Sequence, residues 1–80
     1  MDRKVLEAGD DNMYSFTTQL TADSSTITFN DDAVDVSKCL IYYNGILLIL
    51  GENYTVTNEK TVELNGWSGK TGDFFTVTGK

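Results

Sequence analysis

The side chains that could do chemistry in this 80-residue chain are few, and their types exclude the commonest catalytic centres. The sequence contains no histidine and a single cysteine, Cys39. Nucleophilic systems that pair serine or cysteine with histidine are therefore excluded, as are zinc sites built from cysteine and histidine. Cys39 begins the apolar run 39–43, where we expect it to pack as a small hydrophobic residue rather than to act as a nucleophile or ligand.

The twelve carboxylates are the remaining source of acid–base or metal chemistry. Two acidic clusters, residues 10–12 and residues 30–32 with Asp35, could offer oxygen ligands to calcium, but neither follows the spacing of a calcium-binding loop. A carboxylate pair could hydrolyse a glycoside, yet so small a domain offers no obvious substrate cleft. The sequence therefore predicts solvated turns at these clusters, no bound metal or cofactor, and no enzymatic activity.

The glycine-rich segment 66–71 is the third candidate site. It resembles the end of a phosphate-binding loop but lacks the first glycine at the required spacing, so we do not expect a phosphate site. Trp67 lies within this segment, and an exposed tryptophan could stack on a sugar or anchor a protein contact. The alternative is that Trp67 folds back over one end of a small core. The sequence leaves both roles open.

The charge and hydropathy of the chain argue against other classes of partner. The net charge is −6 and no cluster of lysine and arginine is present, which opposes binding to nucleic acid. The longest aliphatic run is too short to span a bilayer, and residues 1–7 lack the apolar segment of a signal peptide. We therefore expect neither membrane nor nucleic acid as a partner, and synthesis in a reducing cytosol, which a lone cysteine suits.

Alternating apolar and polar residues predict the elements that position these side chains. Turn signals recur about every ten residues, which is typical of an all-β fold, a small antiparallel sandwich or barrel-like domain of about six to seven strands. Residues 1–12 are expected to form a flexible N-terminal arm before a single β-domain over residues 13–80. The expected strands span residues 13–18, 26–29, 38–43, 46–50, 54–57, 61–64 and 74–78.

The segment 44–50 is the most informative part of this pattern. Asn44-Gly45 is a strong signal for a two-residue hairpin turn, and five consecutive aliphatic residues follow it. In a regular strand over 46–50, alternate side chains would make both faces apolar, so both faces would need cover. A partner subunit could supply that cover, or the strand could lie between two layers of its own domain. If a partner subunit supplies the cover, the expected interface residues are Leu40, Tyr42, Ile46, Leu48 and Leu50.

Five short motifs occur in a fixed order along the chain. They are Thr-Ile-Thr-Phe at 26–29, an aliphatic strand with Tyr-Asn-Gly-Ile-Leu-Leu within 40–48, Gly-x-x-Tyr-Thr-Val at 51–56, Thr-Val-x-Leu at 61–64, and Gly-Asp with a terminal strand at 72–77. This order resembles the small β-domain of tailed-bacteriophage structural proteins, of the tail fibre, head fibre and capsid decoration type. The Trp67 loop departs from that pattern, since the family often carries small residues there.

The resemblance implies a function without catalysis. It suggests a structural component of a virion, assembled in the host cytoplasm, that self-associates, commonly as a homo-oligomer and often as a homotrimer, and docks on other virion subunits. It gives no catalytic residues to carry over. The alternative function from the residues themselves is a carbohydrate-binding or adhesive β-sandwich module that uses Trp67 to contact a host glycan.

Overall fold

The computed structural model describes residues 14–79, so the predicted arm over residues 1–12 lies outside the described residues. The described chain contains seven strands and one 3-10 turn. The strands are β1 (Tyr14–Gln19), β2 (Thr26–Thr28), β3 (Cys39–Tyr43), β4 (Ile46–Leu47), β5 (Tyr54–Asn58), β6 (Thr61–Leu64) and β7 (Phe74–Gly79), and the 3-10 turn is η2 (Val36–Lys38).

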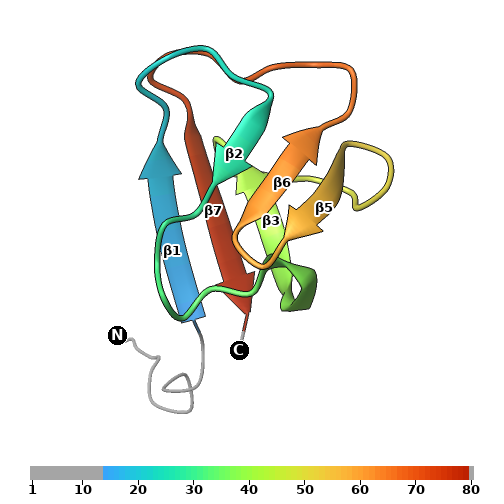
Figure 1. Ribbon diagram of the computed structural model, residues 1–80. Coiled ribbons are helices and arrows are strands. Elements are labelled where there is room, and N and C mark those ends of the chain that lie inside the picture. The colour runs from blue at the N-terminus through green and yellow to red at the C-terminus, as the bar shows by residue number, and fades with distance from the viewer. Residues whose placement is uncertain (1–13, 80) are drawn as a thin grey trace.

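The strands form two antiparallel sheets that face each other (Figure 1). The larger sheet has the order β1-β7-β3-β4, and the smaller has the order β2-β6-β5. The C-terminal strand β7 lies between β1 and β3, so that Val77 is opposite both Phe16 and Ile41. This arrangement confirms the all-β prediction and is consistent with a small sandwich.

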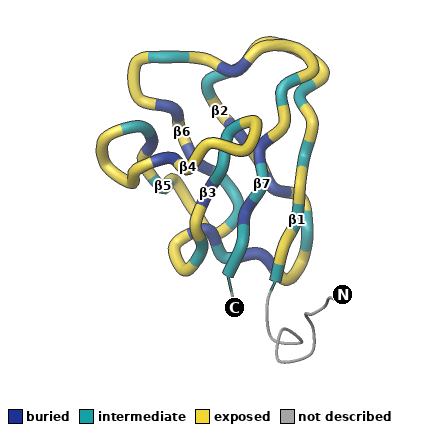
Figure 2. The backbone as a smooth tube through the Cα atoms, turned by 180° about the vertical axis from the view of Figure 1, so that it is seen from behind, coloured by how far each residue is buried: buried dark blue, intermediate teal, exposed yellow. Residues whose placement is uncertain are grey.

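The core lies between the two sheets and follows the alternation seen in the sequence. Along β7, Phe75 and Val77 are fully buried, while their neighbours point to the outer face. Figure 2 shows the same alternation of buried and exposed positions along the tube. Each large apolar side chain removed from water in this way contributes about 1.5–3 kcal/mol. The buried apolar residues are Ile27, Phe29, Val34, Val36, Ile41, Leu48, Tyr54, Val62, Leu64, Phe75 and Val77.

The acidic loop before β3 ends in the 3-10 turn η2. Asp35 begins this turn: its carboxylate accepts hydrogen bonds from the Ser37 hydroxyl at 2.6 Å and from the Ser37 backbone N–H at 3.2 Å. The Ser37 hydroxyl lowers the pKa of Asp35 most, with a smaller contribution from the backbone donor. Asp31, in the same loop, accepts a hydrogen bond from the Tyr14 hydroxyl. Burial, together with that bond, raises the pKa of Tyr14 to about 12.

The β3–β4 hairpin contains the predicted turn, because Asn44 and Gly45 have φ of 48° and 89°, the signs that a type I′ turn requires. The prediction of a strand over 46–50 is wrong in length, since β4 ends at Leu47. The chain turns away because the Ile49 carbonyl accepts from the backbone N–H groups of Glu52 and Asn53. The Ile49 N–H in turn donates to Asn53 Oδ1 at 2.8 Å.

Candidate interaction surface

The outer face of the four-stranded sheet is an uncharged surface. Residues paired across neighbouring strands point to the same side, so the register assigns each strand's contribution to this face. None of these residues is acidic or basic, and each is exposed or half-buried. Figure 2 views the molecule from this side. We call this surface the outer face; it consists of Ser15, Thr17 and Gln19 of β1, Phe74, Thr76 and Thr78 of β7, Leu40 and Tyr42 of β3, and Leu47 of β4.

Large exposed apolar side chains lie on the outer face and beside it. Leu40, Leu47 and Phe74 belong to this face, whereas Ile46 is paired with Tyr43 and therefore lies on the opposite side of the sheet, at its edge. Within residues 14–79, six large apolar residues are 44% to 64% exposed, and all six lie on β3, β4, the loop after β4, or the first residue of β7. Single exposed apolar residues are normal on a protein surface, but a cluster of them marks an interaction site. We call this cluster the apolar patch; its members are Leu40, Ile46, Leu47, Ile49, Leu50 and Phe74.

Most of the interface residues expected from the sequence lie at this surface, and one does not. Leu40, Ile46 and Leu50 belong to the apolar patch, and Tyr42 is half-buried on the outer face. Leu48 is only 9% exposed, so its placement at an interface is wrong. The Leu48 N–H donates to the Ile41 carbonyl at 2.8 Å, and the Leu48 side chain joins the core of its own domain.

Three members of the apolar patch were not among the expected interface residues: Leu47, Ile49 and Phe74. The sequence held a signal for Phe74. If Phe75 and Val77 point inward, the alternation of a strand turns Phe74 outward. Leu47 and Ile49 had no such signal, because within a run of five aliphatic residues no polar neighbour shows which side chains face water.

Trp67 is half-buried and packs over one end of the core. Its ring meets Tyr43 edge to face, with 5.0 Å between ring centroids, and lies 6.3 Å from the ring of Phe75. The indole Nε1 donates to the Asn53 carbonyl at 2.8 Å. Trp67 therefore holds the turn after β4 against the core. Contact between its exposed part and a glycan or partner stays a prediction.

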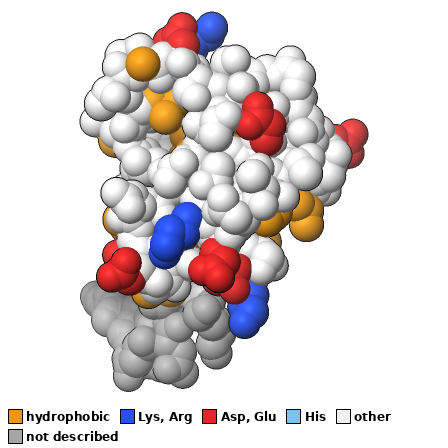
Figure 3. All heavy atoms as spheres, in the orientation of Figure 1, with side chains coloured by type: hydrophobic (Ala, Val, Ile, Leu, Met, Phe, Trp, Pro, Cys, Tyr) orange, Lys and Arg blue, Asp and Glu red, His pale blue; other side chains and the backbone are white. Residues whose placement is uncertain are grey.

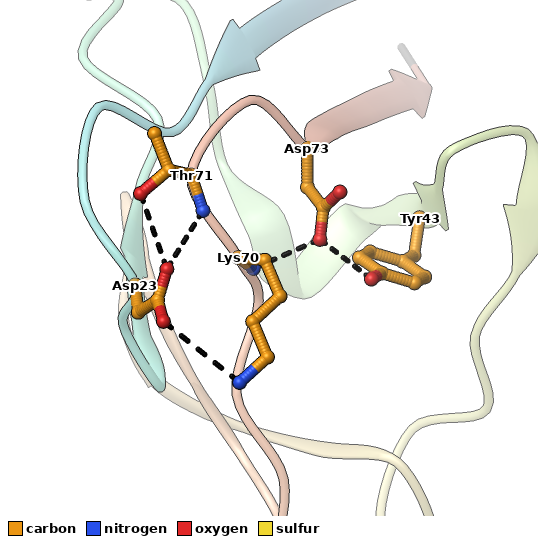
Figure 4. Close-up of polar contacts among 5 residues, drawn as sticks. All are labelled: Asp23, Tyr43, Lys70, Thr71 and Asp73. Carbon is orange, nitrogen blue, oxygen red and sulfur yellow. Dashed lines mark hydrogen bonds and ion pairs between the residues drawn. The ribbon is translucent and has the colours of Figure 1, made fainter.

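Asp73 ties the hairpin turn to the start of β7 (Figure 4). Its carboxylate accepts hydrogen bonds from the Tyr43 hydroxyl at 2.6 Å, the Lys70 backbone N–H at 2.8 Å and Asn44 Nδ2 at 3.2 Å. The Tyr43 hydroxyl, followed by the other two donors, lowers the pKa of Asp73, and the same bond raises the pKa of Tyr43. Asn44 also exchanges hydrogen bonds with the Phe74 backbone. These contacts fix Phe74 beside the hairpin that carries the rest of the apolar patch.

A second carboxylate, Asp23, holds the glycine-rich segment from the other side (Figure 4). It accepts from the Thr71 backbone N–H at 2.8 Å and the Thr71 hydroxyl at 3.1 Å, and it lies 3.8 Å from Lys70 Nζ. The two Thr71 donors lower the pKa of Asp23 most, and Lys70 adds a smaller effect. The backbone N–H groups of Lys70 and Thr71 thus bind the protein's own carboxylates.

The described residues offer few other sites. Between residues 14 and 79, no three histidine, cysteine or carboxylate residues are grouped so as to hold a metal ion. The acidic cluster at 10–12 lies outside this range. The same stretch of chain contains no enclosed pocket. Nor does any helix in the described part of the chain have the length and hydropathy to cross a membrane.

Comparison with known protein families, with curated proteins and with solved structures found no match to this chain. The likeness to phage structural domains therefore depends on the order of the five sequence motifs alone.

Proposed function

We propose that this protein is a non-enzymatic structural component that works by self-association through the apolar patch, and that the assembly it serves is a bacteriophage virion. The observation that carries the proposal is the grouping of six large, half-exposed apolar side chains on one hairpin and the strand beside it. Water-exposed aliphatic surface of this kind is stabilised by contact with another protein surface.

Burial of the patch would favour association. If two subunits each bury about 400 Å² of apolar surface, the size of a large patch on a monomer, the gain is roughly 20 kcal/mol. The loss of translational and rotational freedom opposes association by about 4–15 kcal/mol. Side-chain ordering and desolvation of polar groups oppose association further, so burial of the patch favours association without fixing its strength. A complex of three copies is what the resemblance implies.

The virion setting is supported by the order of the motifs. The five matching segments lie on β2, the β3–β4 hairpin, β5, β6 and β7, so each falls on an element of one domain. A direct test is mass spectrometry of purified particles of the virus that encodes the chain. A structural component is present in fixed proportion to the major capsid or tail protein, and its absence from the particles contradicts the virion setting.

Self-association through the patch is tested by replacing two of its members. Ile46→Thr with Leu50→Gln removes apolar surface at exposed positions, so the far-UV circular dichroism spectrum stays the same while the mass measured by light scattering falls to that of one chain. Thr55→Ser with Thr57→Ser, on the smaller sheet, is the control and leaves the mass unchanged. Retention of the oligomer in the patch variant would contradict the role of the patch.

A further inference from the structure

We propose that the whole outer face, and not only the apolar patch, is the contact surface, and that a second copy of the chain stacks on it with the same face about a two-fold axis. This inference rests on the proposed function, because it names the surface and the symmetry through which self-association takes place.

Charge is the first argument that the occupant is a second copy. Each chain carries a net charge of −6, so two copies repel one another unless they meet through a neutral surface. The four strands of the larger sheet contain no acidic or basic residue. The opposite side of the molecule, seen in Figure 3, carries acidic and basic side chains. Glu63 of β6, in the smaller sheet, is exposed. The outer face is therefore the surface on which like chains meet with least repulsion.

The composition and continuity of the outer face also fit a contact between two sheets. Its β1 side carries short polar side chains, including Thr17 and Thr76, whose hydroxyls are 2.8 Å apart across the strands. Its exposed apolar members are Leu40 of β3, Leu47 of β4 and Phe74 at the start of β7. Depletion of charge with aromatic and aliphatic anchors characterises the centre of a protein interface. The β1–β7 and β7–β3 registers run without a bulge, so the face is continuous from one edge strand towards the other.

The area required for a stable dimer favours use of the whole face. The strands are about 4.8 Å apart; β1 and β7 have six residues each, β3 has five and β4 has two, so together they cover roughly 300 Å² in projection. A typical stable interface buries about 800 Å² on each partner. Side chains that project from the face, together with Ile49 and Leu50 in the adjoining loop, raise the area that each partner can bury. The apolar patch alone would bury a smaller area.

The two-fold symmetry follows from having one suitable surface. An isologous contact needs only a surface that matches itself. A ring of three needs each chain to present two different surfaces, and in the described part of the molecule the second one would include the charged loops or the smaller sheet with Glu63. Two sheets stacked about 10 Å apart, at the usual angle of about 30°, place one uncharged face on the other.

Lysine substitutions at the far edge of the sheet test the inference. Thr17 and Ser15 are exposed on β1, two strands away from Leu40 on β3. Thr17 lies diagonally across from Phe74 of the patch, whereas Ser15 is opposite Thr78 and is the more distant of the two from Phe74. Thr17→Lys and, as a second variant, Ser15→Lys place a charge inside the proposed contact. The control is Thr55→Lys, which makes the same change in net charge on the smaller sheet, directly opposite Glu63. Association of each is measured by sedimentation equilibrium, after circular dichroism shows that the fold is retained.

We expect Thr17→Lys and Ser15→Lys each to weaken dimerisation by at least about tenfold, since a buried unpaired charge opposes association. Thr55→Lys leaves the dissociation constant of the dimer within about twofold of the wild-type value, because a substitution on the exposed surface away from the contact has little effect. If both β1 variants associate as strongly as the wild type, the contact is confined to the patch. That result overturns this inference and leaves the proposed function intact. A trimeric wild-type protein overturns the two-fold pairing only. A monomeric wild-type protein overturns both proposals.

Discussion

The Asp73 carboxylate is the clearest example of one residue that serves several parts of the structure. It accepts hydrogen bonds from a strand residue, a turn residue and a loop backbone, so it joins the β3–β4 hairpin to the beginning of β7. The sequence showed Gly72-Asp73 only as a turn. Two of the three donors, Tyr43 and Asn44, are 30 and 29 positions away, and such distant partners leave no local pattern in a sequence.

Asp73 gives the protein a pH dependence of known sign. Because its pKa is lower in the folded than in the unfolded chain, its stabilising contribution is present above the unfolded value of about 3.9 and is lost as the pH falls through the folded value. The raised pKa of Tyr43 acts only above about pH 10 and does not affect this range. We expect Asp73→Asn to be less stable than wild type at pH 7, and the difference to shrink as the pH falls below about 3.9.

Urea unfolding curves at several pH values measure this difference. Asp32→Asn, which removes an exposed loop carboxylate, is the matched control. If Asp73→Asn and wild type differ by the same free energy of unfolding at pH 7 and at pH 2.5, the carboxylate does not act through its charge.

At the scale of the element, the β3–β4 hairpin shows what the sequence can and cannot specify. Asn44-Gly45 predicted the turn, because the backbone conformation of that turn favours these residue types. The course of the chain after Leu47 depends instead on Asn53, whose side chain binds the Ile49 N–H. The strand therefore ends early, and the regular alternation expected for residues 46–50 is lost. Apart from the apolar run of β3, polar and apolar residues alternate in the other strands, and all of these strands agree with prediction to within about one residue.

Leu48 and Leu50 provide a matched test of this correction. We expect Leu48→Ala to lower the free energy of unfolding by about 2–5 kcal/mol, because it leaves a cavity in the core. Leu50→Ala changes that free energy by no more than about 0.5 kcal/mol when both are measured on dilute, dissociated protein. Urea unfolding of the two variants gives the comparison. Equal losses would mean that the chain follows a regular strand through residue 50.

At the scale of the whole molecule, the two sheets have different outer surfaces. The smaller sheet presents threonines and Glu63 to solvent, whereas the larger presents an uncharged face that merges with the apolar patch. This difference depends on the sheet order β1-β7-β3-β4, which brings the first and last described strands side by side. The sequence predicted the strands and an apolar interface near the hairpin. It could not show the outer face, because no pattern along the chain specifies that strand order.

The mass of the purified chain in solution, measured by light scattering after size exclusion over a range of concentrations, tests the central claim most directly. Self-association through the apolar patch predicts a mass that is a multiple of the chain mass of 8.9 kDa and that falls on dilution. A mass of 8.9 kDa at every concentration, from a chain with the circular dichroism spectrum of a β-protein, would contradict it.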